Sequence, residues 1–250
     1  MKLPQLRIAS LITLLLLVTA TLGFSQKGKK PSEQPTASNS GKSECLDMHK
    51  HYDRMFHQSL EFGDMAVATE AIYGLLSLHP DSTALLDTLA ALYFQRAAWP
   101  QVILVSTEIL AKNPTNQGAL ELRAVANQSM GRAKEALEDY EQLYGKTRNP
   151  YHLYEITALQ FAMKRFGECE ASVQRLINDP EIKDKQIDIT MQDGRAQEVP
   201  LLAAALNLSG VMSLEQGKKD SAKAAFEAAL KAYPEFVLAK NNLDSLNNLK

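Results

Sequence analysis

Four side chains near residue 50 are of types that bind metal ions, and they recur at every fourth position. These are Cys45, His49, Asp53 and His57. Residues four apart are neighbours on a helix, so Asp53 with either histidine could chelate a divalent cation. All four positions extend over about 18 Å of helix, so one ion cannot use them together. The simpler interpretation is the polar flank of a helix that buries Tyr52 and Phe56, with a metal or ligand site as the alternative.

The remaining sequence offers no other chemistry of this kind. It contains no phosphate-binding loop, no Gly-x-Gly-x-x-Gly, no His-Glu-x-x-His, no Gly-x-Ser-x-Gly and no Cys-x-x-Cys. An enzyme needs several groups fixed around one reacting atom, so we expect a non-catalytic protein without a cofactor. The 27 basic and 29 acidic residues give a net charge of −2, which argues against nucleic acid as a partner. Two cysteines in 250 residues exclude a disulfide-stabilised scaffold.

The amino-terminal segment 1–25 has the pattern of a secretory signal peptide. Lys2 and Arg7 precede an apolar run over 8–22, and the small residues Gly23 and Ser25 precede a cleavage site at Gln26. The alternative is an uncleaved anchor, because the stretch 8–24 reaches the lower limit of length for spanning a bilayer. Residues 26–44 are almost free of apolar side chains and carry a net charge of +2, which predicts a disordered basic linker.

The elements that position the polar residues follow from an internal repeat of about 34 residues. Small side chains recur at this spacing, with one interval lengthened by an insertion, at Ala68, Val102, Ala136, Cys169 and Ala222. Four residues after each comes a larger apolar side chain, with Ser106 as the substitute after Val102, and seven residues after each comes an apolar one, which places them on one helical face. Glycines at 63, 131 and 217 stand where a helix must end and turn. Each unit is therefore predicted to be two helices joined by a short turn.

This pattern resembles the tetratricopeptide repeat family over residues 49–250, most closely in the fifth unit with Gly210, Ala222, Phe226, Ala229 and Pro234. The resemblance implies an all-α fold, a right-handed α-solenoid of about five helix-turn-helix units in a domain over 45–250. Residues 235–250 are predicted to form a C-terminal capping helix. An insertion at 181–200 contains alternating apolar residues and an Asp193-Gly194 pair, which predict a small β-hairpin with a two-residue turn. An irregular loop is the alternative there.

In this family the first helix of each unit lines the concave groove, and the resemblance implies which side chains line it here. The partner-binding candidates are Asp53, His57, Asp87, Phe94, Glu121, Gln128, Tyr151, Tyr154, Phe161, Asn207 and Leu214. Some members clamp a C-terminal carboxylate with basic and amide side chains, but the corresponding places here include Asp53, Asp87 and Glu121, so that clamp is absent. Acids and aromatic residues favour an apolar or basic protein segment. The alternative is that Phe94, Phe161 and Leu214 only pack between units.

The sequence therefore predicts an exported interaction scaffold. The end of the apolar run, Gly23-Phe24-Ser25-Gln26, resembles signal sequences of Gram-negative bacteria, which implies the periplasm or outer cell envelope and no stable membrane insertion after cleavage. In that oxidising compartment Cys169 is expected to be a buried free thiol, because units three apart do not touch. Cys45 is either free or paired with another chain.

Processing of the amino terminus is directly measurable. We expect the mature protein to begin at Gln26, because the apolar run is short and ends in small residues. The intact mass of protein recovered from the producing cell checks this. A membrane-bound species that retains Met1 to Ser25 would instead establish the anchor.

Overall fold

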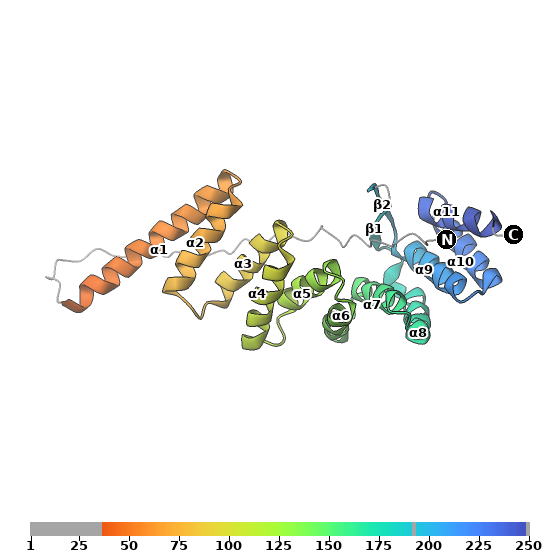
Figure 1. Ribbon diagram of the computed structural model, residues 1–250, viewed down its shortest axis with the longest axis horizontal. Coiled ribbons are helices and arrows are strands. Elements are labelled where there is room, and N and C mark those ends of the chain that lie inside the picture. Colours follow the sequence, from red (N-terminus) through yellow and green to blue (C-terminus); the bar gives the residue numbers. More distant parts are fainter. Residues whose placement is uncertain (1–36, 192–193, 249–250) are drawn as a thin grey trace. The chain divides into compact units, whose positions relative to one another are not determined.

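The computed structural model describes residues 37–191 and 194–248, in which helices follow one another through short turns (Figure 1). The signal peptide predicted at 1–25 and residues 26–36 of the predicted linker lie outside the described residues. The helices are α1 Ala37–Glu61, α2 Met65–Leu78, α3 Thr83–Gln95, α4 Trp99–Lys112, α5 Gln117–Ser129, α6 Ala133–Thr147, α7 Pro150–Ala162, α8 Phe166–Ile177, α9 Leu201–Glu215, α10 Lys219–Ala232 and α11 Val237–Asn248. A 3₁₀ turn at Pro180–Ile182 precedes the strands β1 Gln186–Thr190 and β2 Ala196–Pro200. None of these helices is long and apolar enough to cross a membrane.

The arrangement confirms the predicted all-α fold of helix-turn-helix units. Within the described residues, ten helices form five successive pairs from α1–α2 to α9–α10, and α11 follows as the predicted C-terminal helix. Helices α1 and α2, α3 and α4, α7 and α8, and α9 and α10 pack against each other. The described chain divides into two compact units, 37–126 and 127–248, whose boundary lies inside α5. Each is described by itself.

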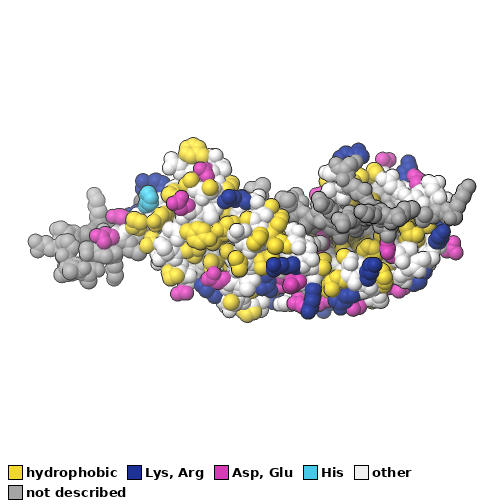
Figure 2. Space-filling view, viewed as in Figure 1, with side chains coloured by type: hydrophobic (Ala, Val, Ile, Leu, Met, Phe, Trp, Pro, Cys, Tyr) yellow, Lys and Arg dark blue, Asp and Glu magenta, His cyan; other side chains and the backbone are white. Residues whose placement is uncertain are grey.

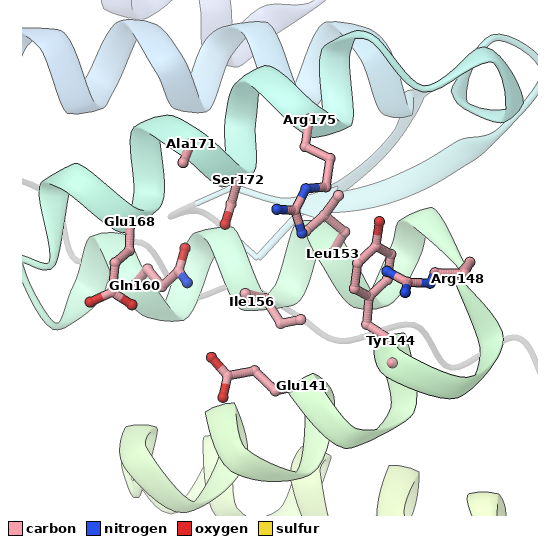
Figure 3. Close-up of a pocket in the computed structure, with 11 residues that line it drawn as sticks. Glu141, Tyr144, Arg148, Leu153, Ile156, Gln160, Glu168, Ala171, Ser172 and Arg175 are labelled. Atoms are coloured by element: carbon pink, nitrogen blue, oxygen red, sulfur yellow. The ribbon is translucent and has the colours of Figure 1, made fainter.

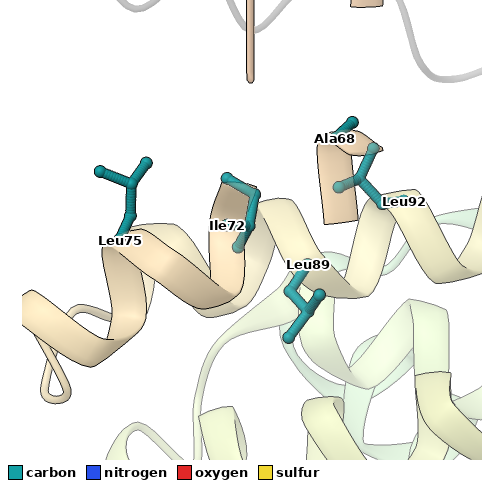
Figure 4. Close-up of a cluster of buried hydrophobic side chains, with 5 residues drawn as sticks. All are labelled: Ala68, Ile72, Leu75, Leu89 and Leu92. Carbon is teal, nitrogen blue, oxygen red and sulfur yellow. The ribbon is translucent and has the colours of Figure 1, made fainter. Parts of the chain in front are cut away.

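A small, fully buried side chain on the second helix is common to all five pairs. The residues are Ala68, Val102, Ala136, Cys169 and Ala222, each 0% exposed. Because a larger side chain would hold the helices apart, these positions set the packing distance within a pair. Around Ala68, the side chains of Ile72 and Leu75 from α2 pack with Leu89 and Leu92 from α3 (Figure 4). The repeat inferred from the sequence is therefore the repeat of the core.

The turn inside each pair contains a residue in the left-handed region. Gly63, Gly131 and Gly217 have φ of 69°, 74° and 75°, as their predicted place at the turn requires. The second and fourth pairs use Ala97 at 51° and Lys164 at 58° instead. These two units lack the glycine that marks the turn in the sequence, yet their helices turn in the same way because the packed pairs impose that geometry.

Helix α1 is longer than the sequence predicts. It begins at Ala37, so its first eight residues belong to the segment 26–44 for which a disordered basic linker was predicted. The residues from 37 to 44 lack apolar side chains after Ala37, which is why composition assigned them to the linker. Once the packed part of α1 is formed, each further helical residue adds a hydrogen bond without a new nucleation step.

The predicted insertion contains the β-hairpin, anchored to helices of the second compact unit. Strands β1 and β2 are antiparallel, with the buried residues Ile187 and Val199 directly opposite each other. A two-stranded hairpin is marginal alone, and here the Leu201 N–H of α9 donates to the Lys185 carbonyl at 2.8 Å. Beyond the strands, Met191 N–H donates to the Arg195 carbonyl at 2.8 Å, and Gly194 has a φ of 83°. The predicted two-residue turn includes Asp193, which lies outside the described residues.

Close helix contact makes a glycine necessary at one position of the last pair. A Cβ on Gly210 of α9 would lie 2.4 Å from a ring carbon of Phe226 in α10, and that ring is fully buried. We therefore expect Gly210→Ala to lower the free energy of unfolding by about 1–3 kcal/mol. The matched control is Gly145→Ala in α6, where the new Cβ would meet no atom within 4 Å and the free energy of unfolding should rise by about 0.5–1 kcal/mol. Urea unfolding of both variants checks this, and equal midpoints would contradict the close contact.

Candidate partner-binding surface

An exposed acidic side chain occupies the same repeat position in α1, α3 and α5. Asp53, Asp87 and Glu121 follow one another at intervals of one repeat length, and all three are exposed. Asp87 accepts a hydrogen bond from Asn116 Nδ2 at 3.3 Å, which opposes a rise in its pKa caused by loss of solvation. Partial desolvation also raises the pKa of Glu121. Successive first helices of residues 37–126 thus each present a carboxylate at one repeating place.

A fourth acid at this repeat position is Glu155, which the sequence analysis missed. It lies one repeat length after Glu121, on α7, so the repeat itself contained the signal. Glu155 is buried, with 4% of its surface exposed, and Gln128 Nε2 donates to its Oε2 at 2.9 Å. Tyr140 in turn donates to Gln128 Oε1 at 3.2 Å. Burial raises the pKa of Glu155 to about 7, and the Gln128 hydrogen bond opposes that rise only in part.

The three aromatic candidates on α7 do not form one open face. Tyr151 is partly exposed, but its hydroxyl donates to the Gln186 carbonyl of the hairpin at 2.9 Å and Lys185 Nζ lies 5.5 Å from its ring centroid. Tyr154 is buried, with 4% of its surface exposed, so the expectation that it stands in an open groove is wrong. Its pKa is raised by this burial and by the adjacent carboxylate. Phe161 packs against the buried cluster around Cys169.

The remaining apolar and amide candidates, Phe94, Leu214 and Asn207, contact residues of their own compact unit. Phe94 stacks edge-to-face on Trp99 with ring centroids 5.5 Å apart. Leu214 packs on the cluster of Phe226, and Asn207 accepts a hydrogen bond from Asn242 of α11 at 2.9 Å. Phe94, Phe161 and Leu214 thus each make packing contacts, and the alternative that they only pack between units stays a prediction. A role for any of them in partner binding stays a prediction.

The polar stripe of α1 is divided between two contacts. His57 Nε2 lies 3.6 Å from Asp53 Oδ1, whereas His49 Nδ1 is turned to His79 Nε2 at 3.1 Å, at the end of α2. Among the side chains described in 37–191 and 194–248, no three His, Cys, Asp or Glu residues are placed to hold one ion. The side chain of Cys45, the first residue of the polar stripe, lies outside the described residues. Cys169 is a buried free thiol, as expected, and burial raises its pKa to about 12.

Known structures share this arrangement of helices, although no family model and no curated protein matches the sequence. A tetratricopeptide repeat protein from Parabacteroides merdae is 17% identical with a TM-score of 0.63, over 80% of this chain and 72% of that one. YrrB, a tetratricopeptide repeat protein described as having an unusual peptide-binding site, is 11% identical with a TM-score of 0.62, over 82% and 97%. MamA from Desulfovibrio magneticus is 12% identical with a TM-score of 0.59, over 76% and 98%. At these identities the likeness is one of fold.

The buried carboxyl of Glu155 should make stability depend on pH. Its pKa is about 7 when folded and 4.5 ordinarily, so the folded state holds this proton between these values while the unfolded state loses it. The free energy of unfolding should therefore fall by roughly 3 kcal/mol as the pH rises from about 4.5 to 7, and change no further above that. Glu155→Gln keeps an acceptor for Gln128 and should remove this component. Urea unfolding at a series of pH values measures both proteins.

Comparing wild type with Glu155→Gln separates the contribution of the Glu155 carboxyl to the pH dependence of stability from the contributions of other titrating groups. Burial lowers the pKa of His152, which contributes the opposite slope, with stability lost as the pH falls below its ordinary pKa. Because His152 is present in both proteins, its contribution cancels in the difference. Identical pH profiles for wild type and Glu155→Gln would show that folding does not raise the pKa of Glu155.

Proposed function

Because the chain has the tetratricopeptide-repeat fold, we propose that it is a non-catalytic interaction scaffold that holds a basic or apolar segment of another protein. One observation carries the proposal: the exposed acids Asp53, Asp87 and Glu121 recur at one position of three successive first helices. Core packing does not require exposed like charges at a repeating place, and such charges repel one another. Lysine or arginine side chains of a partner would neutralise them, which favours binding of a basic segment.

Apolar surface in the same unit supports an additional contribution from hydrophobic contacts. Leu46, Met48 and Leu60 are exposed large side chains of α1, and Figure 2 shows further hydrophobic side chains gathered over α2 and α3. Charged groups act mainly on the encounter rate and on partner choice, whereas buried apolar anchors supply most of the binding energy. A partner segment that combines basic and apolar residues fits both features.

The second compact unit is less suited to this role through its first helices. Its hairpin contacts Tyr151, α11 contacts Asn207, and the acid at the repeating position, Glu155, is buried. We therefore assign the binding surface to α1, α3 and α5 within residues 37–126. The sequence of residues 1–25 supports export, and we infer that the scaffold acts in the periplasm or outer envelope of a Gram-negative bacterium.

The experiment first identifies the partner and then measures its binding to two double variants that carry the same change of charge. Cross-linking in the producing cell identifies the partner, and binding of the purified partner to residues 26–250 is then followed over time. Asp87→Lys with Glu121→Lys should lower the association rate constant by about tenfold at low salt. Added salt should lower the wild-type rate towards that of the variant, because screening weakens the same attraction.

The control carries the same change of charge on second helices of the same unit. Glu70→Lys with Glu108→Lys alters exposed residues of α2 and α4 and should leave the association rate within about twofold of wild type. Circular dichroism confirms that both variants keep their helical content. Equal association rates for the two double variants would place the binding surface elsewhere.

A further inference from the structure

A cavity of about 310 Å³ lies in the second compact unit, walled by α6 and α8 with α7 as its floor (Figure 3). Helices α6 and α8 are the second helices of consecutive pairs, whereas the acids of the proposed partner surface lie on first helices of the other unit. The cavity is large enough for a small molecule. It is therefore a candidate ligand-binding site that is separate from the proposed partner surface of residues 37–126.

Charged groups of opposite sign line the two ends of this cavity. Arg148 and Arg175 lie at one end, and Glu141 and Glu168 lie at the other (Figure 3). Arg165 makes a bidentate ion pair with Glu168, and Glu141 contributes to the raised pKa of Arg165. The acidic end thus has a net charge of −1, from two carboxylates and one guanidinium, and the basic end has +2. A carboxylate fits the basic end, and an ammonium group fits the acidic one.

The middle of the cavity is apolar, with small residues in its walls. Ile156 of α7 lies between the charged ends, and Leu153 of the same helix lies towards the arginine end (Figure 3). Gly145, Ala171 and Ser172 are the wall residues without a long side chain, and a Cβ built on Gly145 would meet no atom within 4 Å. The space beside Gly145 is therefore open, and an aliphatic group could occupy the middle of the cavity without displacing the protein.

An unpaired polar group provides the second, independent indication of a ligand. Gln160 lines the cavity with only 4% of its surface exposed, and its Oε1 atom has no hydrogen-bond partner. Buried amide oxygens are almost always paired, because an unpaired one loses its hydration without compensation. Because Oε1 is itself shielded from solvent, the Gln160 amide must turn towards the cavity for a ligand N–H group at the acidic end to supply the missing donor.

We propose that this cavity binds a small zwitterion of the amino-acid or dipeptide class. The carboxylate pairs with Arg148 and Arg175, the aliphatic part lies on Ile156, and amine or amide N–H groups donate to Gln160 Oε1 near Glu141. A single ligand of this class would contact the charged groups at both ends of the cavity, its apolar middle and the unpaired Gln160 oxygen. It does not depend on the partner surface of residues 37–126.

The direct test is calorimetric titration of residues 26–250 with the dipeptide Ala-Leu and with free leucine. Saturable binding by at least one is expected below about 10 mM. Ala-Leu amide lacks the carboxylate and N-acetyl-Ala-Leu lacks the ammonium group, and each change should weaken dipeptide binding, by at least about tenfold for the amide. If only leucine binds, leucine amide replaces the blocked dipeptides. Absence of saturable binding by both, or equal affinity of the acid and its amide, would overturn the proposal.

Two pairs of variants locate the site. Gly145→Leu fills the cavity and should abolish binding, whereas the matched Gly145→Ala should keep affinity within about threefold of wild type. Gln160→Leu should weaken binding while raising the urea midpoint of the unliganded protein, because it removes an unpaired buried oxygen. A purely structural Gln160 would not show these two changes together. Unaltered affinity in Gly145→Leu would show that a zwitterion binds elsewhere.

Discussion

Close contact between the two helices of each pair is the constraint on which the other features depend. One position on the second helix is filled by a side chain no larger than valine, from Ala68 to Ala222, and all five residues there are fully buried. Gly210 shows how little room remains, since a single added carbon would collide with Phe226. At such distances the pairs have few ways to pack. The turns must then adapt, which explains why Ala97 and Lys164 accept a left-handed backbone that glycine takes elsewhere.

The repeat allowed most of the fold to be predicted because its signal lies in local residue size and spacing. The buried small residues, the five helix pairs and the final helix all follow from offsets that the sequence displays. The start of α1 was not predictable in this way. It depends on how many neighbouring residues a packed helix extends into. Composition assigned the residues after Ala37 to a linker because that contribution does not appear in their own side chains.

The candidate site was less predictable, because exposure is a property of tertiary neighbours. Tyr154 was expected in an open groove because the family resemblance implies that the first helices line the concave face, yet it is buried. Its neighbour Glu155 occupies the position that Asp53, Asp87 and Glu121 occupy in earlier units. The shared register fixes where such a carboxylate lies on its helix, and the surroundings decide whether it is solvated. In α7 the surroundings include Gln128, so an acid of the same register becomes a buried group with a raised pKa.

The same reasoning separates the two surfaces by the kind of ligand that each can hold. Exposed carboxylates on α1 and α3 remain in water, so they act over a distance and favour an extended basic partner without fixing its conformation. Around the α6–α8 cavity, Arg148 and Arg175 are exposed, whereas Gln160 is buried. Water reaches the charged ends, so recognition there depends on the spacing of opposite charges, and on hydrogen bonding only at the buried floor. Regular packing alone would leave Gln160 Oε1 unpaired, and a ligand that donates to it stabilises the folded state in which the cavity exists.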